Sequence, residues 1–144
     1  MNLIPGVEST GSALSAEKIR LEIIAQNIAN ANTTQDHEGN VYQRKDVAFE
    51  AYVTSPERRT PGYVDENLYR GVKVVDVYND PAPGRMIYNP GHPHANDAGM
   101  VQMPNVEMSR EMVDLISASR AYEANLTVVK TARRMAQQAI SIGR

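Results

Sequence analysis

The sequence predicts an α+β fold in which two long terminal helices pair as a coiled-coil-like layer around a small β-rich middle domain. Apolar residues recur at helical spacing over both ends of the chain. Turn-forming residues and short β-branched runs fill the middle. At 144 residues the chain has the length of one domain. We therefore expect an N-terminal helix over 1–32, a β-rich domain over 33–104 and a C-terminal helix over 105–144.

Composition restricts the classes of function that the chain can serve. It carries 15 Lys and Arg against 17 Asp and Glu, a formal net charge of −2, which gives no strong attraction to nucleic acid or anionic lipid. It has no cysteine, which excludes disulfides and a thiol nucleophile. Residues 1–20 lack a basic segment followed by an apolar run, so we expect no cleaved signal peptide. We predict no nucleic-acid partner.

The N-terminal segment repeats an apolar residue every seven positions. Val7, Leu14, Leu21 and Ile28 make this series, and Ile24 joins the same side. A seven-residue period is typical of a helix face that packs against a partner helix. We expect these five side chains to contact helices of neighbouring subunits.

The N-terminal helix should end at a cluster of asparagines over 30–32. Asparagine tolerates left-handed backbone angles, and its side chain competes for backbone hydrogen bonds. On local chemistry alone the cluster is a helix C-cap.

Short strands are predicted in the middle of the chain. Val47, Phe49 and Ala51 alternate with polar or small residues and should face inward on the first strand. Further strands are expected at 71–78, 85–88 and 100–103, separated by Pro- and Gly-containing turns. The prolines and arginines of 53–63 indicate an exposed loop. Together these strands predict one small sheet that needs helices over one face for stability.

The C-terminal helix is predicted to run from Met108 to Ile142 without Gly or Pro. It carries two apolar stripes, which suits a helix wedged between neighbours. The residues of these stripes expected to contact neighbours are Met112, Leu115, Ile116, Tyr122, Leu126 and Val129.

The length of this helix indicates assembly. Roughly 35 residues span about 52 Å at 1.5 Å per residue, whereas a compact globule of this size is only about 37 Å wide. We therefore expect other chains to cover the helix ends.

Several motifs in order match one family. They are Ala25–Thr33 (Ala-Gln-Asn-Ile-Ala-Asn-Ala-Asn-Thr), Tyr42-Gln43-Arg44 followed by Phe49, Tyr88–Pro93, Pro104–Val106, Glu111–Val113 and Ser117–Asn125. In this order they resemble the flagellar rod and hook axial proteins, and within that family the proximal-rod members. The resemblance covers nearly the whole chain.

The resemblance implies a structural subunit of the flagellar basal-body proximal rod. Such subunits transmit torque through their terminal helices around an export channel. The implied partners are other rod proteins, copies of the same chain and the flagellar type III export apparatus, which exports subunits from the cytoplasm. The motif residues Asn27, Asn30, Asn32 and Thr33 would form an elbow that sets the angle between the helices and the β domain.

Alternative functions have less support. His92, His94 and Asp97 are close in sequence, but a zinc site needs three or four convergent ligands and a nucleophile is not marked. We therefore predict no catalytic residue, no metal and no cofactor, and no small-molecule substrate. A helical cytosolic adaptor or secretion chaperone would explain the apolar stripes but not the strand-rich middle. A membrane-surface helix would require basic residues flanking an aromatic face.

Overall fold

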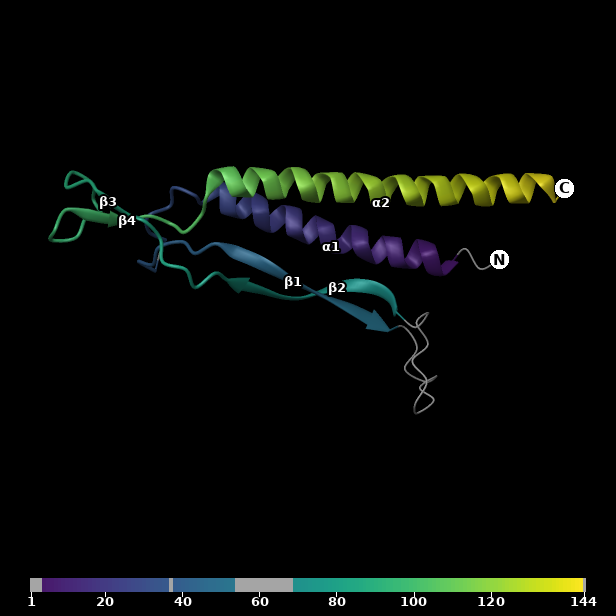
Figure 1. The fold of residues 1–144 in the computed structure, drawn as a ribbon, viewed down its shortest axis with the longest axis horizontal. Helices are drawn as coiled ribbons and strands as arrows, with labels where there is room; N and C mark the ends of the chain where they lie inside the picture. Colours follow the sequence, from purple (N-terminus) through teal and green to yellow (C-terminus); the bar gives the residue numbers. More distant parts are fainter. Residues whose placement is uncertain (1–3, 37, 54–68, 144) are drawn as a thin grey trace, which may run out of the picture.

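The computed structural model describes residues 4–36, 38–53 and 69–143. Six elements follow in chain order: α1 (Ile4–Ala29), β1 (Lys45–Val53), β2 (Tyr69–Asn79), β3 (Met86–Tyr88), β4 (Met100–Gln102) and α2 (Met108–Ile142). The molecule is elongated, and its long axis follows the helices (Figure 1). This arrangement confirms the predicted α+β class. Neither described helix is long and apolar enough to cross a membrane.

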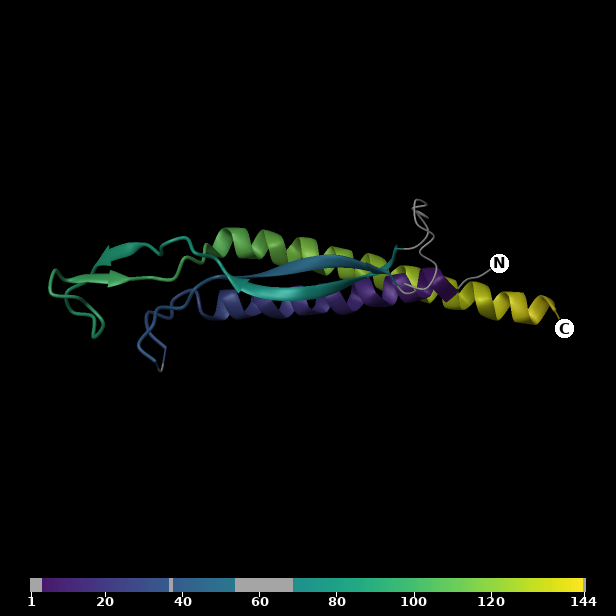
Figure 2. The same ribbon diagram turned by 90° about the horizontal axis from the view of Figure 1, so that it is seen from below.

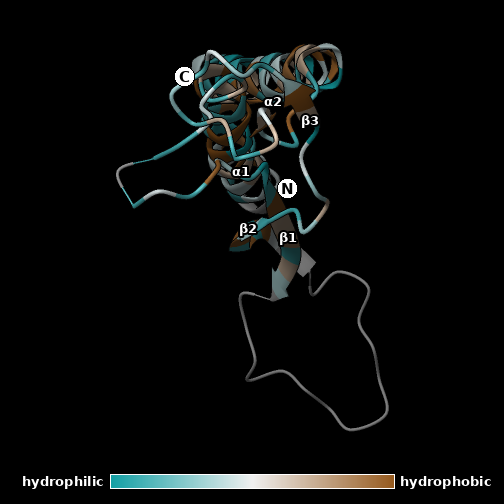
Figure 3. Ribbon diagram, turned by 90° about the vertical axis from the view of Figure 1, so that its left-hand side faces the viewer, coloured by the Kyte–Doolittle hydropathy of each residue, from teal (hydrophilic) through white to brown (hydrophobic). Residues whose placement is uncertain are grey.

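The fold has three layers. α1 lies between α2 and the β1–β2 hairpin, as the view along the long axis shows (Figure 3). The two helices run antiparallel, and β3–β4 lies beyond their common end (Figures 1 and 2). The buried apolar side chains are Ala16, Ile23, Ile24, Ala31, Val47, Val101, Val106 and Ala118. The core is therefore a narrow strip along α1 that depends on small and aliphatic residues.

α1 ends at the asparagines, as predicted. Asn30 donates from its backbone N–H (3.0 Å) and from its side-chain Nδ2 (2.9 Å) to the carbonyl of Gln26. No non-glycine residue in the described ranges has a positive φ. Of the two properties of asparagine on which the prediction relied, the structure shows the side-chain hydrogen bond to the backbone and not the left-handed conformation.

The middle region forms two separate two-stranded antiparallel sheets, β1–β2 and β3–β4, so the prediction of one sheet is wrong. The β1–β2 register shifts between Ala48 and Phe49. The extra residue is Val75 on β2, because Ala48 pairs with Asp76 and Phe49 pairs with Val74, so the alternation along β1 itself is unchanged. Val47 is buried, but Phe49 is 42% exposed, so the prediction of an inward-facing, covered side chain at Phe49 is wrong. Of the predicted loop 53–63, only Val53 lies within the described residues.

The β1–β2 hairpin and α1 come into close contact where Ser12 faces Gly71 and Val72. The Ser12 hydroxyl accepts a hydrogen bond from the backbone N–H of Val72 (3.0 Å) and donates to the carbonyl of Ser9 (2.7 Å). A Cβ added to Gly71 would lie 2.6 Å from the Tyr52 ring and 2.7 Å from Ser12 Oγ. Glycine at this position therefore allows strand and helix to touch.

The β3–β4 hairpin depends on two glycines. A Cβ on Gly84 would lie only 1.8 Å from the carbonyl oxygen of Met103. Gly99 has a φ of 72° in the connecting turn, where L side chains are strained. Next to the other end of the hairpin, the Met103 N–H donates a hydrogen bond to the Arg85 carbonyl (2.8 Å). The two chain segments are therefore held together at this end as well as at the turn.

α2 begins and ends as the sequence predicts. Glu107 occupies its N-cap position without a side-chain capping bond. The helix has 35 residues, about 52 Å at 1.5 Å per residue, against 26 in α1. Its last turns therefore extend past the first residues of α1 (Figure 1).

Candidate functional site: a buried polar junction and an exposed helix face

A cluster of polar side chains joins both helices to β1 where these elements meet. We call it the junction: Asn27, Tyr42, Arg44, Asn105 and Glu111. Glu111, from the first turn of α2, has no exposed surface. Its Oε1 accepts from Arg44 Nε (2.6 Å) and its Oε2 accepts from Asn27 Nδ2 (3.0 Å). The carboxylate thus connects α2 to the other two elements at once.

Asn27 of α1 is also fully buried. Its Nδ2 donates to the Lys45 carbonyl (2.8 Å) as well as to Glu111, and its Oδ1 accepts from Lys45 N–H (2.9 Å) and from the Tyr42 hydroxyl (2.9 Å). The amide therefore makes all four hydrogen bonds available to it. It binds both backbone groups of Lys45, the first residue of β1, and so fixes the strand against the helix.

Arg44 carries the positive charge of the junction and is 6% exposed. It also pairs with Asp46 (Nη1–Oδ2, 3.1 Å) and Asp114 (Nη2–Oδ2, 3.5 Å). Burial lowers the pKa of Arg44, but hydrogen bonds to Glu111 and Asp46 outweigh burial and raise it overall. The guanidinium therefore remains charged and serves as a permanent donor.

Two neighbours of Arg44 have shifted pKa values. Burial raises the pKa of Tyr42, and the Glu111 charge raises it further. For Asp46, burial raises the pKa, but the backbone N–H of Val47 and the Arg44 side chain lower it by more. At neutral pH the phenol is therefore a neutral donor and Asp46 a carboxylate.

Asn105 fixes the connection that leads into α2. Its Oδ1 accepts from the backbone N–H of Arg44 (2.6 Å) and its Nδ2 donates to the Asp80 carbonyl (3.1 Å). Asp80 N–H in turn donates to Arg44 O (2.7 Å). The residues after β2, before β1 and before α2 are thus held together by one amide.

The elbow residues of the predicted motif have unequal roles here. Asn27 is the centre of the junction, and Asn30 ends α1. Thr33 binds Asn30 through its backbone N–H (3.0 Å) and its hydroxyl (3.2 Å). Asn32 is exposed. The elbow's role in setting the angle between helices and hairpin stays a prediction.

The residues predicted to contact neighbouring subunits occupy three environments. Ile24 is 4% exposed and is buried within the subunit. Half-buried residues form the second group: Leu14, Leu21, Ile28, Leu115, Tyr122, Leu126 and Val129. Val7, Met112 and Ile116 are exposed. Because α1 packs on α2 of the same chain, much of the predicted seam is already occupied.

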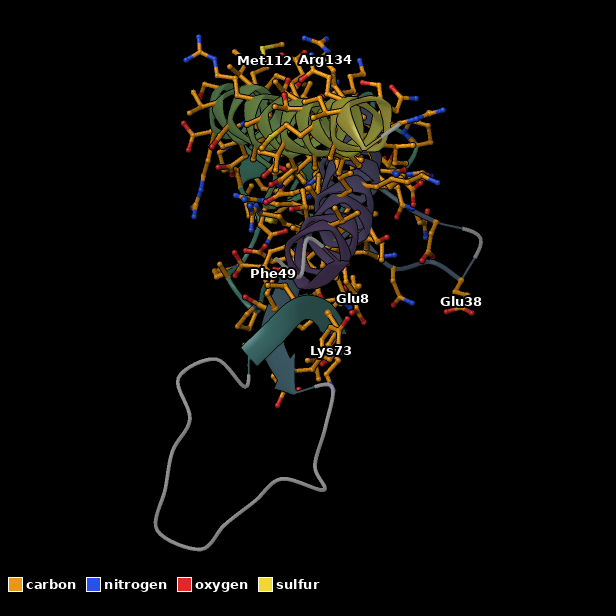
Figure 4. The ribbon with its side chains drawn as sticks, turned by 90° about the vertical axis from the view of Figure 1, so that its right-hand side faces the viewer. Glu8, Glu38, Phe49, Lys73, Met112 and Arg134 are labelled. Carbon is orange, nitrogen blue, oxygen red and sulfur yellow. The ribbon has the colours of Figure 1, made fainter. Side chains whose placement is uncertain are left out.

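The side of α2 that faces away from α1 carries exposed apolar side chains among charged ones, and no other described element covers it. Met112 and Arg134 lie on the side of α2 that faces away from α1 (Figure 4). The apolar residues of this face are Met112, Val113, Ile116, Val128 and Met135, each at least half exposed. At the end of the helix, where it extends past α1, Ile140 is 71% exposed and Ile142 85% exposed. We call the side of α2 that carries Met112, Val113, Ile116, Val128 and Met135 the outer face.

The described residues offer little for catalysis or metal binding. They contain no group of three or more His, Asp or Glu side chains placed to hold a metal ion. His92 Nδ1 accepts from the backbone N–H of His94 (3.1 Å), and His94 Nδ1 lies 2.8 Å from the Thr34 hydroxyl. An open groove of ≈ 700 Å³ beside the junction is lined by loop residues such as Asp36, Pro81 and Met103. The side chains of His92 and His94 therefore take part in hydrogen bonds within the subunit.

Comparison with known proteins agrees with the architecture. Residues 8–35 match the family model of flagella basal body rod proteins, and residues 97–142 match that of the flagellar basal body rod FlgEFG C-terminal region. The flagellar basal-body rod protein FlgC of Borreliella burgdorferi is 36% identical over 99% of this chain and 98% of its own length. The chain belongs to the FlgC family of flagellar basal-body rod proteins.

FlgC proteins of distant bacteria give the same result. That of Yersinia enterocolitica is 38% identical over 99% of both chains, and that of Bacillus subtilis is 34% identical over the full length of both. Membership in the FlgC family makes this chain a structural component of the flagellar basal-body rod.

Sequence reasoning missed the chemical role of Arg44 and Glu111, although both lie in motifs shared with the rod family. A signal was present: Glu111 lies four residues before Leu115 and therefore on the same side of the predicted helix as that apolar residue. A charged residue on a packed helix face needs a partner. The partner, 67 positions away, has no periodic relation to it, so only the fold identifies it.

Proposed function

We propose that this chain is a structural subunit of the proximal part of the basal-body rod and transmits torque through its paired helices. Its partners are copies of itself and other rod proteins, and its role is mechanical and not enzymatic. Two features of the subunit support this. The junction holds helices and hairpin in one arrangement, and the outer face of α2 has no partner within the subunit.

The outer face is the observation that carries the proposal. A single domain of this size gains stability by burying apolar residues, yet Val113 and Ile116 are 66% and 55% exposed. Contiguous exposed apolar surface marks sites of protein association. Neighbouring rod subunits would remove this face from water, and load would pass through the same contacts.

We further propose that the flagellar export apparatus delivers the chain to the rod. The narrow core is consistent with passage of an unfolded chain, because few large side chains must be repacked afterwards.

Ile116→Asp tests the outer face. Ile116 is exposed, so the subunit alone should keep its helix content and unfolding midpoint, while a desolvated carboxylate should block incorporation into the rod. Motility and rod content of purified basal bodies measure the effect. Ser117→Asp is the matched control, because it adds the same charge at the adjacent exposed residue. Normal rods with Ile116→Asp contradict the proposal.

Leu21→Asp and Leu126→Asp should also block incorporation. Both side chains are half-buried in the subunit, so these substitutions should lower the stability of the free chain as well. The difference between these variants and Ile116→Asp separates loss of folding from loss of assembly. Normal motility in all three would refute a mechanical role for the helix pair.

A further inference from the structure

Glu111 selects which helix can pack on α1 and β1. We infer that the surface made by α1 and β1 is a seat that accepts a helix only where that helix brings a carboxylate opposite Asn27 and Arg44. The seat is set by residues outside α2, and the remaining contacts between α1 and α2 discriminate poorly. Glu111 is therefore the specificity-determining residue of the helix pair.

The seat presents donors only, and its orientation is fixed without α2. The Asn27 Oδ1 must accept the Lys45 N–H, so Nδ2 must face both the Lys45 carbonyl and α2. Asp46, two residues along the strand, holds Arg44 Nη1 at 3.1 Å. The free amide hydrogen and the Nε–H of Arg44 therefore both point at the space that Glu111 occupies. Two converging donors, one of them charged, match a carboxylate.

Apart from the longer and more exposed Arg44–Asp114 pair (3.5 Å), the rest of the contact that α2 makes lacks such discrimination. It consists of small and aliphatic residues such as Ile24, Leu115 and Ala118, which are buried or half-buried. Hydrophobic contacts of about the right size tolerate exchange. In the proposed rod, related subunits would offer many helices of similar apolar pattern, and this extension of the inference rests on the proposed function.

A helix that lacks a hydrogen-bond acceptor at this position would pack on the seat with a less favourable free energy. It would cover Arg44 and the Asn27 amide and leave two donors desolvated and unpaired. Breaking a buried charge pair from one side is strongly destabilising, while an apolar pair in the same place can be tolerated. The seat therefore works by rejection of the wrong helix as well as by attraction of the right one.

A double-mutant cycle in the full-length chain tests this inference. Glu111→Leu is made with Arg44 present and in an Arg44→Met background, and the folding equilibrium constant is measured by urea unfolding. With Arg44 present, we expect the substitution to lower the constant by about a hundredfold. In the Arg44→Met background the loss should be smaller by at least about tenfold, because the charge that demands the carboxylate is gone.

Glu111→Gln and Glu123→Leu complete the experiment. Glutamine keeps the shape of glutamate but should also fold at least about tenfold less favourably, because it removes the negative charge. Glu123 is exposed on the same helix, so its substitution should have the same effect, within about twofold, in both backgrounds. Equal losses for Glu111→Leu in the two backgrounds, or failure of the Arg44→Met, Glu111→Leu double variant to fold better than Glu111→Leu alone, overturns the inference. The cycle uses the isolated chain, so its outcome is independent of rod assembly.

Discussion

The first and last turns of α2 belong to one helix, but only the first turns bury side chains against the rest of the subunit. Glu111 near the start has no exposed surface and both of its oxygens are bonded, whereas Ile142 at the end is 85% exposed. The first region is polar and satisfied, and the second is apolar and uncovered. Burial in α2 therefore depends on whether a side chain faces α1 and on how far α1 extends along the helix, and not on residue type.

The two ends of α2 are therefore suited to different kinds of contact. Polar groups with fixed partners define a unique geometry, so the junction suits a fixed connection between helices and hairpin. Apolar side chains accept a range of packings, so the outer face suits contacts with several neighbours.

Asn27→Ala should have the largest effect on the isolated subunit. It removes four hydrogen bonds and leaves Glu111 Oε2 and both backbone groups of Lys45 without their partner, so we expect a loss of about 3 kcal/mol in unfolding free energy. Urea unfolding followed by circular dichroism measures the change. Asn32→Ala, at an exposed residue of the same motif, is the control, and equal losses for the two would contradict a special role for the junction.

Gly71→Ala should be the next largest. The added methyl group would lie 2.6 Å from the Tyr52 ring and 2.7 Å from Ser12 Oγ, which forces the hairpin away from α1 and costs about 2 kcal/mol. Gly11→Ala is the matched control, because nothing lies within 4 Å of its added Cβ. That helical substitution should stabilise the chain by about 0.5–1 kcal/mol. If both substitutions stabilise the chain, close contact between α1 and the hairpin is absent.

Asp46→Asn should have the smallest effect, because Asp46 is only partly buried. We expect a loss of about 0.5 kcal/mol at neutral pH. The folded-state pKa of Asp46 is lowered, so its contribution is present above the unfolded-state pKa and is lost as the pH falls through the folded-state value. Stability measured against pH should therefore show the two proteins converging in acid. A difference that grows as the pH falls contradicts the assigned ion pair.

The sequence was informative wherever a periodic pattern specified structure. The seven-residue spacing of Leu14, Leu21 and Ile28 predicted α1, and the uninterrupted run from Met108 predicted both ends of α2. The ordered motifs identified the rod family. These features are local or repeat along the chain, so they can be read without knowing what lies opposite.

Features that depend on partners distant in sequence were not predictable in the same way. Phe49 is exposed although it alternates with the buried Val47 along β1, because the burial of a strand residue depends on which element lies over it. The separation of the strands into two sheets, β1–β2 and β3–β4, depends on how the strands pair in the folded chain. The Arg44–Glu111 pair joins residues 67 positions apart. In each case the deciding contact is tertiary.

Hydrogen exchange along α2 of the isolated full-length chain tests the central claim most directly. We predict that amides of 112–118, next to the junction, exchange at least about a hundredfold more slowly than those of 134–142, where the helix extends past α1. In assembled rods the slow exchange should extend to the end of the helix. Uniform protection along the whole of α2 in the isolated chain, or rapid exchange beside Glu111, would contradict the division between a completed and an open end.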